Sequence, residues 1–261
     1  MDWEFVGRAR LWYRQANERD EKVRQLSEDF LGDERDVFVV TMTMNRHMLD
    51  LFFKDGPLAD ETVKAKVAIA DRANTLLWSS WNDILCGRYS SAAEHWRSLL
   101  ESPQFMAAFG SNEALTKSWI SDPGFDIHSA RTAVVKWLRD SGRASESRKW
   151  FSERTRDHKE VQLYSHVTPQ SCLGPLATDG KHVLMRNEPS AKRTRECALF
   201  LAKDALELMR SLWWAFPNDE RVNEAWDKHG AGALEWGARK LTQVYGELGL
   251  DCADPEEDGN Q

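Results

Sequence analysis

The chain has 261 residues, of which 41% are hydrophobic and 30% charged, and its formal net charge is -7. This composition is typical of a soluble globular protein and excludes a disordered chain, while the negative charge gives no general attraction to nucleic acid. With 8 prolines and 15 glycines, turn residues are sparse, which favours a few long helices. The 12 tryptophans, spread along the whole chain, predict one continuous tryptophan-rich core.

Hydrophobic periodicity and turn residues predict helices over residues 2–31, 34–53, 60–87, 90–109, 112–120, 126–140, 146–164, 190–216 and 220–248. The first helix carries an intermittent apolar stripe and is expected to pack on the outside; the stripe consists of Trp3, Val6, Arg10, Tyr13, Val23, Leu26 and Phe30. Gly32 and Asp33 are interpreted as the end of this helix and the N-cap of the next.

The two consecutive amphipathic helices at 60–87 and 90–109 form the predicted centre of the fold. Gly87 is expected to end the first of them, and Ser91 with Glu94 fits a capping box that opens the second. Pro103 is expected to perturb or end that second helix. Because the connection is short, the two helices should be antiparallel neighbours.

Residues 165–189 differ from the rest, since they contain three of the eight prolines and an Asp-Gly pair at 179–180 between two apolar runs. This pattern predicts a long loop with a small β-hairpin. The expected fold is an all-α multi-helix bundle with this one irregular excursion. A single helical domain over 1–250 is predicted, followed by an acidic flexible tail over 251–261.

Sequence features that would indicate an unusual compartment or a cofactor are missing. There is no CxxC pair, no apolar segment of signal-peptide type and no run of about 18 apolar residues, so a cytoplasmic protein that does not enter the membrane is predicted. Helical Glu-x-x-His pairs, phosphate-binding glycine loops and the G-x-S-x-G nucleophile motif are also missing. No metal or cofactor is therefore predicted. Helical spacing favours core packing for the Trp78/Trp81 and Trp213–Trp214 pairs.

Three charged residues on the second central helix form the first part of a candidate polar pocket. Glu94, Arg97 and Glu101 are three and four residues apart, so they share one helix face. One interpretation is a surface ion-pair ladder worth a few tenths of a kcal/mol per pair. The other is a partly buried arginine that carboxylates hold at a cleft, where it meets an anion.

Tyr164, Ser165 and His166 form the second part of the candidate pocket. They stand at a predicted helix end just before the long loop, and His166 can titrate near neutral pH. The alternative is that Ser165 caps or turns the chain and that His166 is an ordinary loop residue. If the pocket is real, Arg97→Ala should weaken binding more than it lowers the melting temperature.

The runs GRYSSAAEHWRSLLESPQF (87–105), NEALTKSW (112–119) and LYSHVTP (163–169) resemble an uncharacterised bacterial all-helical family. The positions that match its pattern are Gly87, Ala92, Arg97, Glu101, Trp119, Ser165 and His166. The resemblance covers about a third of the chain, and it implies a helical bundle and no established activity.

That family is distantly similar to HEPN-type bundles, many of which are metal-independent ribonucleases of toxin or antiphage systems. The resemblance implies an Arg-x4–6-His pair on one helix, whereas Arg154 and His158 have only three residues between them. No clear match is expected on a strong helix.

The sequence and the resemblance together lead to two alternative functions. The first is a non-catalytic binding or interaction protein with a polar pocket around Arg97, Glu101 and His166, whose partner is another protein or a second copy. The alternative is a HEPN-like ribonuclease acting on RNA, with His158 or His166 as general base and Arg97 or Arg154 steadying phosphate.

Overall fold

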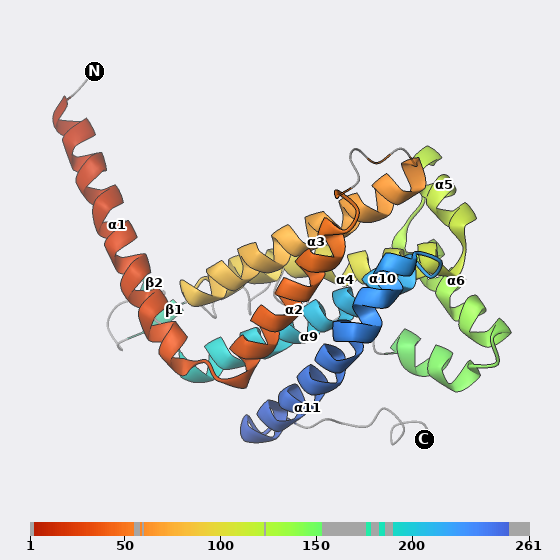
Figure 1. The fold of residues 1–261 in the computed structure, drawn as a ribbon. Coiled ribbons are helices and arrows are strands. Elements are labelled where there is room, and N and C mark those ends of the chain that lie inside the picture. The colour runs from red at the N-terminus through yellow and green to blue at the C-terminus, as the bar shows by residue number, and fades with distance from the viewer. Residues whose placement is uncertain are drawn as a thin grey trace.

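The computed structural model describes residues 3–54, 58, 60–122, 124–152, 176–178, 183–185 and 190–250. The helices are α1 (Trp3–Phe30), α2 (Asp33–Asp50), α3 (Glu61–Leu85), α4 (Tyr89–Ser111), α5 (Glu113–Ser121), α6 (Ile127–Asp140), α9 (Ala191–Ala215), α10 (Glu220–Ala225), the π-helical segment η1 (Trp226–Gly230) and α11 (Ala231–Glu247). Residues 144–152 are also helical. The predicted all-α bundle is confirmed (Figure 1).

The main hydrophobic core lies among α2, α3, α4, α9 and α11. As predicted, α3 and α4 are packed against each other, and α4 and α2 both pack on α9 (Figure 1). The largest fully buried side chains of this core include Phe38, Met48, Leu77, Ile84 and Leu208. Burial of apolar surface between these helices is the main source of stability, at roughly 25 cal/mol per Å².

A second, smaller cluster lies where the C-terminal part of α4 meets α6 and the helix at 144–152. Its buried members are Ala107, Ala108, Phe109, Ala130, Val134, Leu138 and Trp150. It adjoins the main core along α4, because Met106 belongs to the main core and Ala107 to the second cluster.

The turn between α3 and α4 has the hydrogen bonds of a Schellman motif. Gly87 has a positive φ of 69°, its N–H donates to the Ile84 carbonyl, and the Arg88 N–H donates to the Asp83 carbonyl at 2.7 Å. Gly87 therefore ends α3 as predicted. The predicted capping box is wrong, because α4 already begins at Tyr89 and its N-cap, Arg88, makes no side-chain cap bond.

The predicted cap at Asp33 is also wrong by one residue, since Gly32 is the N-cap of α2 and Asp33 is its first residue. Asp33 instead adds negative charge to the first turn of α2, where the helix dipole favours it.

The prediction that Pro103 perturbs or ends the second central helix is wrong as to its end, since α4 runs through Pro103 to Ser111. Side chains next to the proline bond the carbonyls of the preceding turn. The Ser102 hydroxyl donates to the Ser98 carbonyl, and the buried Gln104 amide donates to the Leu100 carbonyl. Pro103 itself leaves only the Leu99 carbonyl without its N–H partner, so the remaining helical bonds and the burial of Leu100 and Met106 carry α4 past it.

Tryptophan packing mostly matches the prediction of a core role. Trp81 is buried and stacks on Phe38 with ring centroids 4.2 Å apart, while Trp213 stacks on Trp226 at 4.5 Å. Trp78 differs, because it meets Phe38 edge-on and stays 45% exposed.

The predicted final helix at 220–248 contains a π-helical interruption. α10 passes into η1 and then into α11, and Gly230 at the end of η1 lies directly over the Trp226 ring. A Cβ at position 230 would be 2.5 Å from that ring. The wider turn thus places Trp226 against Trp213, which sequence periodicity does not reveal.

The small hairpin expected near 165–189 is present as a pair of short strands. β1 (Leu176–Thr178) pairs antiparallel with β2 (Val183–Met185), with Thr178 opposite Val183. The other residues of 165–189 lie outside the described ranges.

The stripe of α1 differs from the predicted one. Tyr13 is 64% exposed and Leu26 is 51% exposed, whereas Val23 and Ser27 are buried. The buried positions repeat at spacings of three and four through Ala16, Asp20, Val23, Ser27 and Phe30, of which Ala16, Asp20 and Phe30 are half-buried. This is one face of a helix.

Candidate functional site

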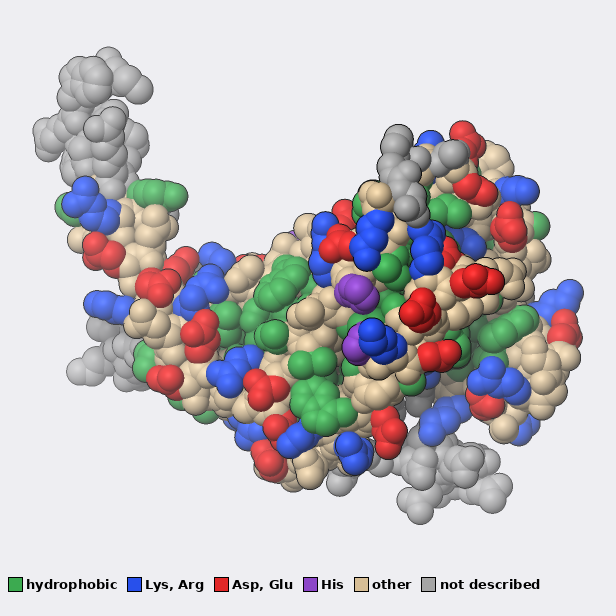
Figure 2. All heavy atoms as spheres, in the orientation of Figure 1, with side chains coloured by type: hydrophobic (Ala, Val, Ile, Leu, Met, Phe, Trp, Pro, Cys, Tyr) green, Lys and Arg blue, Asp and Glu red, His purple; other side chains and the backbone are tan. Residues whose placement is uncertain are grey.

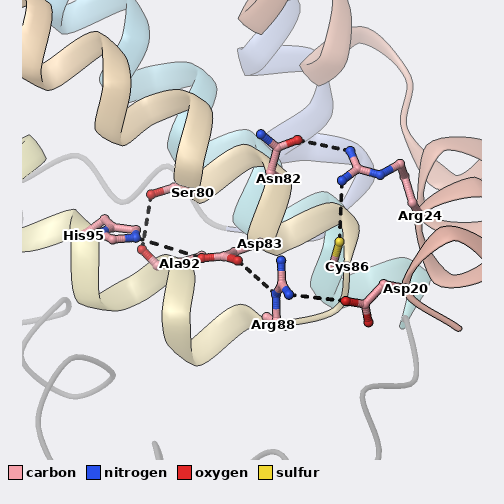
Figure 3. Close-up of polar contacts among 9 residues, drawn as sticks. All are labelled: Asp20, Arg24, Ser80, Asn82, Asp83, Cys86, Arg88, Ala92 and His95. Atoms are coloured by element: carbon pink, nitrogen blue, oxygen red, sulfur yellow. Dashed lines mark hydrogen bonds and ion pairs between the residues drawn. The ribbon is translucent and has the colours of Figure 1, made fainter. Parts of the chain in front are cut away.

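The C-terminal half of α1 is attached to the end of α3 by Arg24 (Figure 3). Its guanidinium donates to the Asn82 side-chain oxygen at 3.0 Å and to the Cys86 sulfur at 3.6 Å. Val23 and Ser27, buried on the same face, add packing beside this contact. Arg24 therefore fixes the direction in which α1 leaves the bundle.

Arg88, at the α3–α4 turn, joins α1 and α3 through two carboxylates (Figure 3). Its Nε donates to Asp83 Oδ1 at 2.9 Å, and its Nη1 donates to Asp20 Oδ2 at 3.3 Å. Asp83 is mostly covered, at 16% exposure, while the Arg88 side chain keeps 40% of its surface in solvent. A partly covered arginine shared by two carboxylates stabilises this junction more than an isolated surface pair does.

His95 lies on the other side of the same carboxylate. Its Nε2 is 3.9 Å from Asp83 Oδ2, and its side chain is 36% exposed. The cluster thus joins a titratable imidazole, a carboxylate and a permanent cation at a surface position. The exposed part of the Arg88 guanidinium is able to contact an anion.

The described cysteines are not suited to nucleophilic chemistry. Burial raises the pKa of the Cys86 thiol, although the nearby Arg88 and Arg24 guanidinium groups partly oppose the shift. Burial also raises the pKa of Cys197 to about 12. Because the thiolate is the reactive form, both groups stay protonated and inert at neutral pH.

The structure brings together only part of the predicted polar pocket. Glu94 lies exposed on α4, and Glu101 is half-buried about two turns further along the same helix. Arg97 lies between them on α4, and its side chain is outside what the structure describes. Tyr164, Ser165 and His166 also lie outside the described residues, as do Arg154 and His158 of the ribonuclease alternative. The pocket remains a prediction.

The sequence interpretation missed Arg88, Asp83 and His95. Six residues separate Arg88 from His95, so this pair has the Arg-x4–6-His spacing that was judged to be missing. The spacing was visible in the sequence. The predicted helix starts at 90, whereas α4 begins at Tyr89 with Arg88 as its N-cap residue.

The outer part of α1, defined as residues 3–19, is the second notable feature. In Figure 1 it runs out from the bundle toward the N-terminus. Among the described residues, the polar side-chain contacts that join α1 to another helix all lie at Asp20 and Arg24. At about 1.5 Å per residue, residues 3–19 span roughly 25 Å of helix.

Three further features of the described residues concern ligand binding. A shallow pocket of about 230 Å³ between α9 and α11 is lined by Leu206, Leu234, Leu241 and six further residues. It lies below the roughly 300 Å³ of a typical small-molecule site. Positive and negative side chains alternate over the face seen in Figure 2, which leaves no broad basic surface there. No group of His, Cys, Asp or Glu within the described ranges is arranged to hold a metal ion.

Among the described helices, none has both the length and the apolar character needed to cross a membrane. Comparison of the chain with protein-family models, with curated proteins and with solved structures finds no match.

Proposed function

We propose that the protein is a non-catalytic interaction protein that binds another macromolecule through the outer part of α1. The observation that carries this proposal is the course of α1, whose C-terminal half is fixed to the bundle while residues 3–19 run out beyond it (Figure 1). An isolated helix of this length is marginal in water, so a helix that projects is stabilised when it packs against a partner.

The anchor supports this role, because a docking helix must be held at a fixed angle. Arg24 on α1 bonds Asn82 and Cys86 at the end of α3. Asp20 on α1 bonds Arg88 at the α3–α4 turn, and Asp83 holds that arginine in place. These bonds set the direction of the outer part of α1. They are made by residues outside that part, so they do not occupy its surface. The polar cluster is thus explained as a structural support, with no reaction required.

Site-specific photo-crosslinking tests the proposal. A photoreactive phenylalanine analogue at Tyr13, a residue that is 64% exposed, should give a discrete adduct in cells, whose second component is identified by mass spectrometry. The same analogue at Lys117 on α5, whose side chain is 69% exposed, serves as a matched control and should give none. Equal labelling from both positions, or none from either, would contradict the proposal.

A second function is favoured by one specific observation, the contact of Arg88 and His95 with the same carboxylate, Asp83. In a metal-independent ribonuclease of HEPN type, His95 would be the general base that accepts a proton, and Arg88 would steady the phosphate. Arg88, however, already bonds two carboxylates, and an RNA phosphate must displace at least one of them.

Purified protein incubated with total RNA without added metal separates the two functions. The interaction proposal predicts no cleavage above that of an Arg88→Ala/His95→Ala double variant. Cleavage by the wild type that falls at least about a hundredfold in this variant would establish the ribonuclease function instead. A His158→Ala/His166→Ala variant reports on the residues of the predicted alternative.

A further inference from the structure

We propose that the acidic tail of this chain, residues 251–261, folds back and binds in the groove between α9 and α11. This inference goes beyond the proposed function, because the groove is formed by helices other than α1. It is supported by the direction of the chain after α11, by the residues that line the groove, and by the opposite charges of the groove and the tail.

The chain reverses its direction directly after α11. Gly249 has a positive φ of 64°, its N–H donates to the Gly246 carbonyl, and the Leu250 N–H donates to the Tyr245 carbonyl at 3.0 Å. These are the hydrogen bonds of a Schellman motif, which turns the chain back over the last turn of the helix. Leu250 is half-buried and packs against the main core. The segment that follows Leu250 therefore begins beside Tyr245.

The groove between α9 and α11 has one end at Tyr245. The two helices are antiparallel, since Tyr245 meets the Phe200 ring on α9, whereas the earlier Gly237 lies against the later Leu206. The shallow pocket of about 230 Å³ between them thus extends from Tyr245 to Arg210. A chain that leaves Leu250 in the reversed direction enters this groove at its Tyr245 end.

The lining of the groove suits an extended acidic segment. Leu206, Leu234 and Leu241 give it apolar surface, and Lys203 and Arg210 bring positive charge. Apolar surface accommodates the small side chains of a peptide, and the cations attract its carboxylates.

The carboxylate in the lining does not cancel this attraction. Glu207 is 11% exposed, and its Oε2 lies 2.5 Å from Arg210 Nη2 on the same helix, so its charge is directed toward that arginine. By contrast, residues 251–261 carry five carboxylates and no lysine or arginine. The charge of the tail is therefore complementary to that of Lys203 and Arg210.

Positive charge continues beyond the Arg210 end of the groove. The hydrogen bond from Arg143, followed by the charges of Arg143 and Arg210, lowers the pKa of the Glu146 carboxyl, so Arg210 lies near the helix at 144–152. Arg148 and Lys149 are exposed on that helix. A tail that follows the groove thus meets further cations where it leaves the groove.

The tail is long enough to follow the groove, and its attachment favours binding. The groove covers residues 234–245 of α11, or about 16 Å at 1.5 Å per residue, whereas the residues 251–261 extend over roughly 35 Å. Because the tail is covalently joined beside the groove, its effective concentration there is on the order of millimolar. A few weak contacts are then enough to hold it. Composition alone predicts a flexible tail, and the groove gives it a place to bind.

Disulfide trapping in the full chain tests the docking. A chain that runs back from Leu250 at about 3.3 Å per residue brings Cys252 to the level of Thr242 in the groove. In a chain that also carries Cys172→Ser, Thr242→Cys should form a disulfide with Cys252 in oxidised glutathione at least about tenfold faster than Gln243→Cys. Mass spectrometry of the digested protein measures the bond.

Gln243 provides the matched control, because it is exposed on the opposite face of α11 and is one residue nearer to Cys252 along the chain. An undocked tail would reach both positions alike. Equal rates at 242 and 243 would overturn the proposal. A disulfide that joins two chains would also overturn it, since a second copy would then fill the groove.

Charge tests whether the carboxylates of the tail carry the binding. Lys203→Glu should slow the bond between Cys252 and the Thr242→Cys site by about three- to tenfold, and raising NaCl to about 1 M should slow it similarly without any substitution. Lys117→Glu, at a lysine 69% exposed on α5, should change the rate less than about twofold. A rate that is insensitive to salt, or equal effects of the two lysine variants, would overturn the proposal.

Discussion

Arg195→Leu is expected to lower the free energy of unfolding by about 3–5 kcal/mol, because it leaves a carboxylate buried without its cation. Glu34 on α2 is fully buried, and the Arg195 guanidinium on α9 donates to both of its oxygens, at 2.8 and 3.4 Å. These bonds to Glu34 and to Glu247 raise the pKa of Arg195, so the cation persists at any usable pH. Denaturant unfolding followed by circular dichroism measures the loss.

Two controls separate the buried ion pair from its surroundings. Glu247→Gln removes only the outer, half-exposed partner of Arg195 and should cost less than about 1 kcal/mol. A Glu34→Leu/Arg195→Leu double variant removes both buried charges and should recover most of the stability that the single variant loses. If the double variant is as unstable as Arg195→Leu, the loss comes from packing, and the explanation based on an unpaired charge is wrong.

Gly110→Ala is expected to destabilise the protein by about 3 kcal/mol or more, since it forces apart two helices of the core. A Cβ at position 110 on α4 would be 1.8 Å from the Trp214 carbonyl oxygen on α9 and 2.6 Å from its carbon. Both obstacles are backbone atoms, which no side-chain rotation can move. The gain of about 1 kcal/mol from replacing a helical glycine by alanine is too small to offset this collision.

Gly232→Ala is the matched control for Gly110→Ala. Gly232 lies in α11, and a Cβ there meets no atom within 4 Å. This substitution should therefore leave stability unchanged or raise it by up to about 1 kcal/mol. The same unfolding measurement compares both variants. Similar effects at the two positions would show that α4 and α9 are not in backbone contact at Gly110.

Most helix boundaries were predictable from the sequence, because they depend on local signals. Gly87 is one example, since a residue with positive φ is what a Schellman turn needs. Pro103 misled the prediction because a proline removes only one helical bond, here the one to the Leu99 carbonyl, while tertiary packing of Leu100 and Met106 in the core holds α4 together. The π-helical turn at Trp226 depends on a contact with Trp213, which local periodicity does not contain.

The candidate site was less predictable than the fold. The Arg88–His95 spacing stood in the sequence, but its meaning depends on a helix start that was misplaced. Asp83 contacts Arg88 and His95 only because the α3–α4 turn folds the two helices against each other. The contact of Asp20 with Arg88, across 68 positions, depends on tertiary packing alone. The stripe of α1 was misread for a similar reason, because the bundle covers only the C-terminal half of that helix.

Amide hydrogen exchange over residues 5–17 of the wild-type chain tests most directly whether the outer part of α1 binds a partner. If it does, these amides should exchange quickly in the purified chain alone and at least about tenfold more slowly once the partner identified by crosslinking at Tyr13 is added well above its dissociation constant. Amides of the buried helices α3 and α9 provide the reference, since their exchange should not depend on the partner. Exchange of residues 5–17 that is equally fast, or equally slow, with and without the partner would contradict the account.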